Sequence, residues 1–480
     1  VRQPHLSRRR RRCRGRRRRR WPPIGVRGHA GTRGLIVIRT PYGRGWHLAE
    51  GIEWRLRGIA FICQDVRGRH DSTGSWEPYV HEREDSAALA EWLQDQPWTP
   101  ECVIASGASY AAGTAWAFAT ETNSADRSFR VDGVVSKVPT IGSDRVKRDP
   151  SGILLLAEHL AWWGEHGDSS SSREGFIPAL MRSDSSLLEH LPVQSMIEEV
   201  GLTSDSPGWL TPILRARKRE DFGGDDLVSA DELSELDIAG LHIGGWDDAM
   251  IRETLRHFTS VGRGPQSLIV GPWAHDLRPG RVGETSFGRL QVEWMESVFA
   301  ARPLTINRVF DRGVGEWSTE PFVTGANRVH LEPDRKDAAY SFLYDASRDR
   351  NNCVVLTFDI KHDSVLSGTP SVELKVHSPE GEADWIAELS VVDPAGVTRS
   401  IARGAGVSLQ PTMVTIDLDP VLHTVRAGDV LTLRIAGSDF PRLARNLGDG
   451  DRYRGTRSTA LHQSFSGSLT LPIRGGTDGG

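Results

Sequence analysis

Ser109 is the residue of this sequence best placed for nucleophilic chemistry. It lies in the segment Ser-Gly-Ala-Ser-Tyr-Ala-Ala-Gly at 106–113, between an apolar run and an alanine-rich stretch. A serine on a tight strand-to-helix turn must adopt a sparsely allowed backbone conformation, so it needs small neighbours such as Gly107 and Ala111. The backbone N–H of Tyr110 would then face a developing oxyanion, with help from the helix N-terminus. Taken alone, a serine beside glycine more often marks an ordinary turn.

Two later segments carry the partners that such a serine needs. A serine hydroxyl requires a general base, and the base requires an acid that fixes its tautomer. The apolar run 241–243 leads into Gly-Gly-Trp-Asp-Asp, which ends at Asp248. The run 267–270 leads into Gly-Pro-Trp-Ala-His, which ends at His275. Serine, acid and histidine thus follow the chain order of α/β-hydrolases, each after a strand, and predict a catalytic triad.

Alternating apolar runs and helical patterns surround these residues and predict a parallel sheet covered on both faces. We assign this α/β-hydrolase core to residues 34–140 and 237–302. Residues 141–236 carry helical patterns with few strands and predict a helical cap. After Pro303, short strand-like runs separated by turn residues predict an all-β jelly roll over 303–480. The predicted helices and strands are at 85–93, 111–122, 153–163, 179–188, 210–217, 249–258 and 290–301, and at 35–38, 58–63, 103–105, 134–138, 241–243, 267–270, 353–359, 370–377, 385–392, 412–418, 430–436 and 466–473.

Length and composition agree with this division. A chain of 480 residues is too long for one core and fits about three domains. With 38% hydrophobic and 25% charged residues it is globular, and no apolar run approaches the ~18 residues of a membrane helix. The four cysteines are widely spaced without a CxxC pair, which argues against a disulfide framework or a structural zinc site. We therefore expect a cytoplasmic protein that does not bind a membrane.

The net charge of −4 is the sum of a strongly basic segment and an acidic remainder. Residues 1–33 contain 14 Arg and no acidic residue, so the remaining chain carries −18. Such a segment is typical of a disordered tail, and a wrong start or reading frame would also produce it. Clustered Arg also neutralises phosphates, so a nucleic-acid or polyanion-binding head is the alternative. We favour the tail or artefact and do not expect a nucleic-acid partner.

Together these motifs resemble the cocaine esterase-like (CocE/NonD) hydrolases, relatives of the X-Pro dipeptidyl-peptidases and α-amino-acid ester hydrolases. The resemblance spans residues ~35 to 473 in order. It implies an α/β-hydrolase core, a helical cap and a C-terminal jelly roll. The segments that carry it are Arg-Thr-Pro-Tyr-Gly at 39–43, Gln-Asp-Val-Arg-Gly-Arg-His-Asp-Ser-Thr-Gly-Ser-Trp at 64–76, 85–92, the serine turn at 107–110, 244–248, 271–275 and 438–446.

The resemblance also assigns roles. It implies Ser109 as the nucleophile, His275 as the general base and Asp248, rather than Asp247, as the triad acid. Tyr42 would donate its hydroxyl to the oxyanion beside the N–H of Tyr110, because a phenol is a neutral donor at neutral pH. No metal or organic cofactor is implied.

Three tryptophans are weaker candidates for the substrate pocket. Trp162 and Trp163 lie in the predicted cap, and Trp246 precedes the triad acid. Ordinary helix packing explains the cap pair equally well. Asp65, Arg67 and Asp71 look catalytic by residue type, but Asp and Arg in a glycine-rich loop mostly satisfy backbone donors and each other.

Two departures from the family pattern matter. The family opens with a strand pair before the strand at 35–38, and residues 1–33 show nothing similar. An uncovered sheet edge would favour association, so a homodimer is the oligomeric state to test. The amino-ester relatives also place a Glu-Asp pair just beyond the triad acid, where this chain has Ala249, Met250 and Ile251. This favours neutral esters over substrates with a free α-amino group.

The resulting hypothesis is a serine hydrolase that cleaves a small-molecule carboxylic ester, or an amide, through an acyl-serine. One alternative is an X-Pro dipeptidyl-peptidase-like aminopeptidase or acylase. Another is a non-catalytic polyanion-binding protein that uses the basic head. A third is a chain that is inactive because its first strands are missing.

Overall fold

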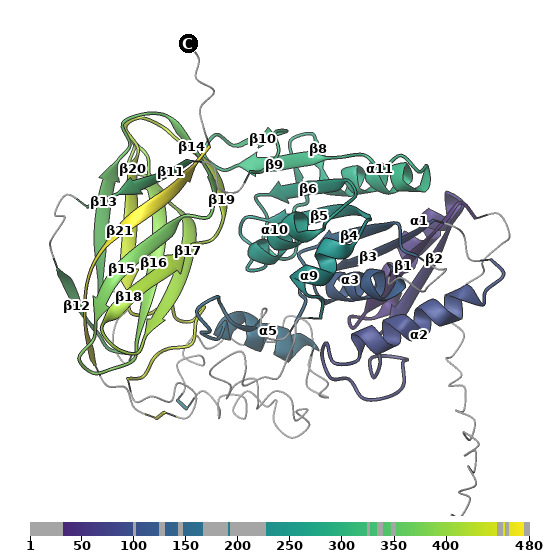
Figure 1. Cartoon of the computed structure of the whole chain (residues 1–480), viewed down its shortest axis with the longest axis horizontal. Helices are drawn as coiled ribbons and strands as arrows, with labels where there is room; N and C mark the ends of the chain where they lie inside the picture. The colour runs from purple at the N-terminus through teal and green to yellow at the C-terminus, as the bar shows by residue number, and fades with distance from the viewer. Residues whose placement is uncertain are drawn as a thin grey trace, which may run out of the picture.

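The protein is described by a computed structural model over residues 32–98, 102–123, 130–142, 147–166, 191–192, 227–323, 327–333, 339–346, 352–448, 455–456 and 460–474. An α/β core and an all-β sandwich lie side by side, and helix α5 lies below the space between them (Figure 1). The predicted fold class, an α/β-hydrolase core followed by an all-β domain, is confirmed. Residues 1–31, which hold most of the Arg-rich head, lie outside the described ranges.

The core is built on an eight-stranded sheet with the order β10-β9-β6-β5-β4-β3-β1-β2. All neighbouring pairs are parallel except β10 with β9. Most of its strands are short, almost completely buried apolar runs, as expected for a sheet covered on both faces. They are β1 Gly34–Thr40, β2 Ile59–Asp65, β3 Val103–Ala108, β4 Gly133–Lys137, β5 Ala239–Gly245, β6 Gln266–Gly271, β9 Asn307–Asp311 and β10 Glu316–Ser318.

Alternate side chains of β1 show how the sheet is covered. Leu35 and Val37 pack in one cluster with residues of α2 and α3, whereas Ile36 and Ile38 pack on the opposite face with residues of α1 and α11. Successive strand residues point to opposite faces, so one apolar run serves both helical layers. The helices of the core are η1 Arg44–His47, α1 Leu48–Leu56, α2 Glu82–Gln94, α3 Tyr110–Asn123, α9 Ala230–Glu235, α10 Ile251–Ser260 and α11 Phe287–Phe299.

The sandwich packs a seven-stranded sheet on a four-stranded sheet around one apolar core. Its strands alternate buried and exposed residues more than those of the parallel sheet, because their outer faces meet solvent. They are β11 Asn327–Leu331, β12 Tyr340–Tyr344, β13 Cys353–Asp359, β14 Ser364–Gly368, β15 Ser371–His377, β16 Ala383–Val392, β17 Thr398–Ser408, β18 Thr412–Asp417, β19 Val421–Val425, β20 Val430–Ala436 and β21 Leu461–Ile473.

The structure places the end of the core differently from the boundary drawn after residue 302. Strand β9 pairs in parallel with β6, and β10 then pairs with β9, so the sheet of the core continues to Ser318. Neither strand was predicted from the sequence, because they are only five and three residues long and partly polar. A two-residue hairpin, β7 Arg281–Val282 and β8 Thr285–Ser286, precedes α11. At the other edge the described sheet ends at β2, and no described strand precedes β1.

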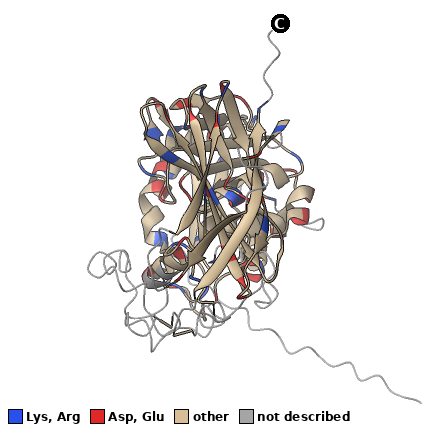
Figure 2. Cartoon of the chain, turned by 90° about the vertical axis from the view of Figure 1, so that its left-hand side faces the viewer, with Lys and Arg blue, Asp and Glu red and all other residues tan. Residues whose placement is uncertain are grey.

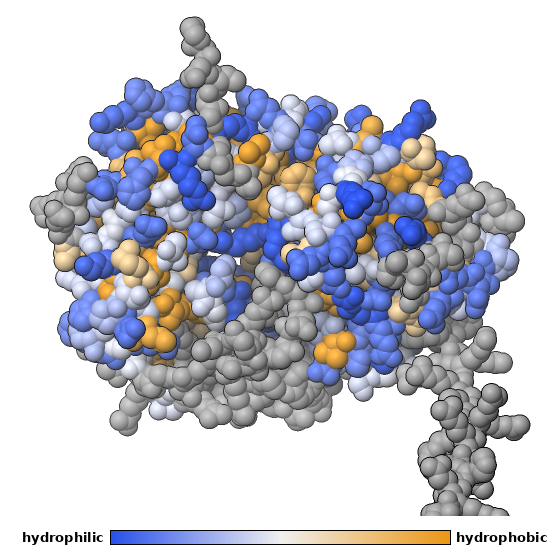
Figure 3. All heavy atoms as spheres, in the orientation of Figure 1, coloured by the Kyte–Doolittle hydropathy of each residue, from blue (hydrophilic) through white to orange (hydrophobic). Residues whose placement is uncertain are grey.

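The surface of the described part is mixed in charge and polarity. Lys and Arg lie among Asp and Glu over the sandwich end of the molecule, so the described residues form no continuous basic face there (Figure 2). Hydrophilic residues cover most of the face seen in Figure 3, with apolar residues between them in small groups. No helix among the described residues is long and apolar enough to cross a membrane.

Helix α5 Leu156–His166 is the described element of the predicted cap that reaches both domains. It overlaps the helix predicted at 153–163. The chain before it bridges to the sandwich, since Leu155 pairs with Leu443 and the N–H of Leu156 donates to the carbonyl of Arg442 at 2.8 Å. The helices predicted at 179–188 and 210–217 lie outside the described residues.

Candidate active site

Ser109 occupies the turn between β3 and α3. Its φ of 56° is in the left-handed region, which is unusual for a residue with a side chain. The turn is tight, because a Cβ at Gly107 would lie 2.0 Å from the carbonyl oxygen of Ala111. The N–H of Ser109 donates to the carbonyl of Lys137 at the end of β4, at 2.9 Å. The predicted requirement for small residues around the serine therefore has a steric origin.

The structure brings the three predicted triad residues into one hydrogen-bonded line. His275, after β6, has its Nε2 3.0 Å from Ser109 Oγ and its Nδ1 2.8 Å from Asp248 Oδ1. Asp248, after β5, is 3% exposed, and its Oδ1 also accepts from the N–H of Met250. Asp247 is turned outward and pairs with Arg312 at 3.2 Å. The strands β3, β4, β5 and β6 run parallel and end at the same edge of the sheet, which is why residues 166 positions apart meet here.

The surroundings of His275 set its basicity. Burial lowers the pKa of this imidazole, but the hydrogen bond from its ring to Asp248 and the charges of Asp248 and Asp276 act against burial and raise the pKa above its ordinary value of 6.5. With Nδ1 facing a carboxylate, the proton of the neutral ring belongs on Nδ1. Nε2 is then free to accept the proton of Ser109.

The two predicted oxyanion donors also converge beside Ser109. The hydroxyl of Tyr42 lies 3.2 Å from Ser109 Oγ, and the backbone N–H of Tyr110 points to the same phenol oxygen at 3.4 Å. Burial raises the pKa of Tyr42 above 10, against the smaller opposing effects of its hydrogen bonds, so the phenol stays a neutral donor. A carbonyl oxygen between these groups would receive two hydrogen bonds.

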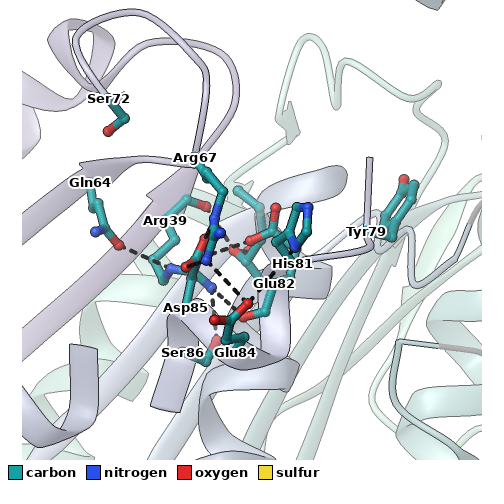
Figure 4. A network of polar contacts seen from close by, with 12 residues as sticks. Arg39, Gln64, Arg67, Ser72, Tyr79, His81, Glu82, Glu84, Asp85 and Ser86 are labelled. Atoms are coloured by element: carbon teal, nitrogen blue, oxygen red, sulfur yellow. Dashed lines mark hydrogen bonds and ion pairs between the residues drawn. The ribbon is translucent and has the colours of Figure 1, made fainter. Parts of the chain in front are cut away.

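A buried polar network supports this side of the serine (Figure 4). The hydroxyl of Tyr110 donates to Glu82 at 2.7 Å, and Glu82 forms an ion pair with Arg39 at 2.9 Å. Arg39 is 2% exposed and also donates to Ser86 and Gln64. The network ties β1, α2 and α3 together beneath Tyr110 and so fixes the position of its backbone N–H.

The Asp and Arg residues of the loop after β2 lie in ion pairs away from the triad. Arg67 pairs with Asp85 of α2, and Arg44 pairs with Asp65 and Asp71 at 2.7 and 2.6 Å. These contacts agree with the structural role that the sequence analysis favoured for them.

The three candidate pocket tryptophans do not lie together. Trp162 of α5 packs near Tyr42 and Trp76, with its indole Nε1 3.5 Å from Tyr42 Oη. Trp246 belongs to another cluster, where its indole donates to the carbonyl of Phe310. It lines a cavity of about 630 Å³ between the core, the start of α5 and the sandwich, which Asp248 also lines. The side chain of Trp163 lies outside the described residues.

Two basic residues near Tyr42 were not singled out from the sequence. Lys147 has its ammonium 4.1 Å from the centre of the Trp162 ring system, and the ring of His166 lies 4.8 Å from that of Tyr42. Neither position carries a local motif, so no signal in the sequence marks it. Among the described residues, no three His, Cys, Asp or Glu side chains are grouped so that they would hold a metal ion.

Comparison with known protein families gives two matches that cover most of the chain. Residues 21–276 match the X-Pro dipeptidyl-peptidase (S15 family) model, and residues 323–468 match the X-Pro dipeptidyl-peptidase C-terminal non-catalytic domain. The first match alone spans more than half of the sequence. This chain belongs to the S15 family. It is therefore a hydrolase of the S15 and CocE/NonD group, as the motifs predicted.

Individual relatives of this S15 hydrolase agree with the family match. It is 23% identical over 520 residues to a cocaine esterase of Rhodococcus sp. (strain MB1 Bresler), covering 87% of this chain and 88% of the relative. An α-amino acid ester hydrolase superimposes with a TM-score of 0.74 at 14% identity, over 93% of this chain and 92% of that one.

Two further solved structures have the same architecture. An aminopeptidase from a marine sediment Thaumarchaeota archaeon has a TM-score of 0.73 at 15% identity, covering 94% and 93% of the two chains. A CocE/NonD family hydrolase from Staphylococcus aureus has a TM-score of 0.64 at 15% identity, covering 93% and 89%. At these identities the structural likeness establishes the fold of the S15 hydrolase, and its substrate must be argued from the site.

Proposed function

We propose that this protein is a serine esterase that cleaves carboxylic esters through an acyl-serine intermediate. The observation that carries the proposal is the continuous line of contacts from Asp248 through His275 to Ser109, at 2.8 and 3.0 Å. Hydrogen-bonded nucleophile, base and orienting acid are the geometric requirement for activating a hydroxyl.

Each proposed step has a residue in position. Ser109 Oγ attacks the ester carbonyl while Nε2 of His275 accepts the serine proton. The carbonyl oxygen becomes an oxyanion that receives hydrogen bonds from Tyr42 and from the N–H of Tyr110. The imidazolium, stabilised by Asp248, then protonates the leaving alkoxide. Water enters, His275 accepts one of its protons, and the acyl-serine is hydrolysed to the carboxylic acid and free Ser109.

Ester cleavage is favoured over removal of X-Pro dipeptides by the residues that follow Asp248. Recognition of a free α-amino group calls for carboxylates next to the reacting centre, since an ammonium needs a charged partner when it leaves water. The positions after Asp248 hold Ala249 and then Met250 and Ile251, both of which are buried. The family name and the archaeal aminopeptidase make peptide cleavage the second candidate, which the experiment below includes.

The test compares the wild type with Ser109→Ala on short p-nitrophenyl esters and on X-Pro p-nitroanilides. We expect ester hydrolysis by the wild type and a loss of at least about 10⁴-fold in the variant, because nothing else at the turn supplies a nucleophile. Equal rates in the two proteins would exclude the proposal. Serine-dependent cleavage of the anilides in preference to the esters would assign the peptidase activity instead.

A further inference from the structure

A buried ammonium group, with no carboxylate partner among the described residues, lies on the Tyr42 side of Ser109. The Lys147 side chain is 4% exposed, and its Nζ lies 4.1 Å from the centre of the Trp162 ring system. Within the described ranges, no carboxylate forms an ion pair or hydrogen bond with this ammonium, which lies over the ring system of Trp162 instead. Burial lowers the pKa of Lys147 to about 7. Burying a charge without an ionic partner is energetically unfavourable, so a functional role for this lysine is worth considering.

Other basic groups lie around the same aromatic residues. The guanidinium of Arg69 lies 4.4 Å from the centre of the Trp76 ring system, and that ring system is 5.7 Å from Trp162. Burial, followed by the charges of Arg69, Lys147 and His70, lowers the pKa of His166 to about 4. Basic side chains therefore lie on the aromatic rings next to Tyr42.

Two described acidic residues of the same stretch of chain contact groups other than the Lys147 ammonium. Glu165 lies beside His166, with 3.7 Å between its Oε2 and the ring Nε2. Asp149 accepts hydrogen bonds from Ser151 and from the N–H of Ile153. The surroundings of Lys147 thus differ from those of His275, whose ring faces the carboxylate of Asp248.

We propose that Lys147 is a specificity-determining residue that binds a carboxylate on the acyl part of the substrate. The inference rests on the proposed esterase function and names its substrate class, namely esters of dicarboxylic acids with one free carboxylate. Lys147 connects to the reacting centre through two contacts, from its ammonium to Trp162 and from Trp162 to Tyr42, whose hydroxyl touches Ser109.

The geometry of acyl transfer assigns the carboxylate to the acyl part. The leaving oxygen must face His275, which protonates it, and the carbonyl oxygen must lie between Tyr42 and the N–H of Tyr110. Lys147 lies on the Tyr42 side, whereas His275 approaches Ser109 from the ends of β5 and β6. A group that reaches Lys147 is therefore on the acyl chain and not on the alcohol.

Two matched ester pairs test the inference. The first is mono-p-nitrophenyl glutarate against its neutral methyl ester, which differ by one charge on the acyl part. The second is 4-carboxyphenyl butyrate against its methyl ester, which differ by one charge on the alcohol part. We expect kcat/KM to favour the charged member of the first pair by about ten- to hundredfold, the range of a charge-assisted hydrogen bond. Preference for the charged member only in the second pair would overturn the acyl assignment.

Three variants separate the charge from the packing. Lys147→Met should reduce the preference within the glutarate pair about tenfold or more, and Lys147→Arg should keep most of it. Lys375→Met removes an exposed lysine of β15 in the sandwich and should leave the preference unchanged. An unchanged preference in Lys147→Met would refute the inference. Failure of the esterase function itself is distinguishable, because the neutral methyl ester would then show no Ser109-dependent hydrolysis.

A measurement on the wild type covers the case in which Lys147→Met does not fold. The preference within the glutarate pair should fall as the pH rises through about 7, because Lys147 loses its charge there while the substrate carboxylate stays ionised. His275 affects both esters alike and cancels in the ratio. Lys147 acts with Arg148 on His159 and with Arg69 on His166. Neither histidine ring changes charge in this range, because burial lowers the pKa of His159 well below 6.5 and that of His166 to about 4. A ratio that is flat from pH 6 to 9 would contradict the role of Lys147.

Discussion

The two sides of Ser109 differ in how their charged groups are paired. On one side, His275 and Asp248 form a compensated pair, in which a buried carboxylate faces the ring that becomes charged during the reaction. On the other side, Tyr42 and Trp162 are neutral donors, and Lys147 behind them is a buried cation with no described carboxylate partner. A base that becomes positively charged during proton transfer needs a negatively charged partner that is already in place. A cation that binds a substrate can instead obtain its negatively charged partner from the substrate.

We expect the largest loss of activity when the negative charge that faces His275 is removed. We expect Asp248→Asn to lower kcat by about 10⁴-fold, because the amide no longer stabilises the imidazolium and favours the wrong tautomer of His275. Steady-state kinetics on a p-nitrophenyl ester measures the loss, and thermal melting checks that the fold is kept. A decrease below tenfold would show that Asp248 does not orient the base.

The Tyr42 side should show a smaller loss of a different kind. Tyr42→Phe removes one of two oxyanion donors, for which about 10²- to 10³-fold in kcat is expected. Because the base is untouched, the midpoint of the pH–rate profile should stay where it is in the wild type. A shifted midpoint, or a rise in KM alone, would mean that the phenol acts on the triad or on binding and not on the oxyanion.

The pH dependence distinguishes the two sides directly. The general base must be neutral, so kcat/KM for a neutral ester should rise with pH and level off above the pKa of His275. That pKa is raised above 6.5 through Asp248, so the rate should fall by about tenfold for each pH unit well below the midpoint. In Asp248→Asn the midpoint should move to lower pH. An unchanged midpoint in that variant would exclude Asp248 as the cause of the shift.

The network below the oxyanion site should affect stability more than chemistry. Tyr110→Phe removes the phenol that donates to Glu82 and accepts from the N–H of Tyr79, but keeps the backbone N–H. We expect a loss of about 1–3 kcal/mol in the free energy of unfolding, because buried polar atoms lose their partner. The change in kcat should stay below tenfold. Chemical denaturation and ester kinetics on the same preparations measure both, and a larger catalytic than structural effect would reverse this assignment.

Much of the fold follows from local patterns. Every strand of the core from β1 to β6 is a buried apolar run or contains one, and each of the three proposed triad residues follows such a strand. The boundary after residue 302 was wrong for the sheet because β9 and β10 are too short and polar to carry a pattern of their own. They form strands because β9 pairs with the edge of β6 and β10 then pairs with β9, and the first of these pairings depends on residues distant in the sequence.

The sequence by itself determined the class of chemistry. Ser109, Asp248 and His275 each follow a strand, and parallel strands end at one edge, so their meeting could be predicted from chain order. The tertiary structure alone decided what surrounds them. Neither Lys147 nor Trp162 lies in a recognisable motif. The packing of α5 against the core places Trp162 beside Tyr42, and the chain before α5 places Lys147 over Trp162. Local propensity predicts strands and turns, but the environment of a buried charged group depends on neighbours that are distant in the sequence.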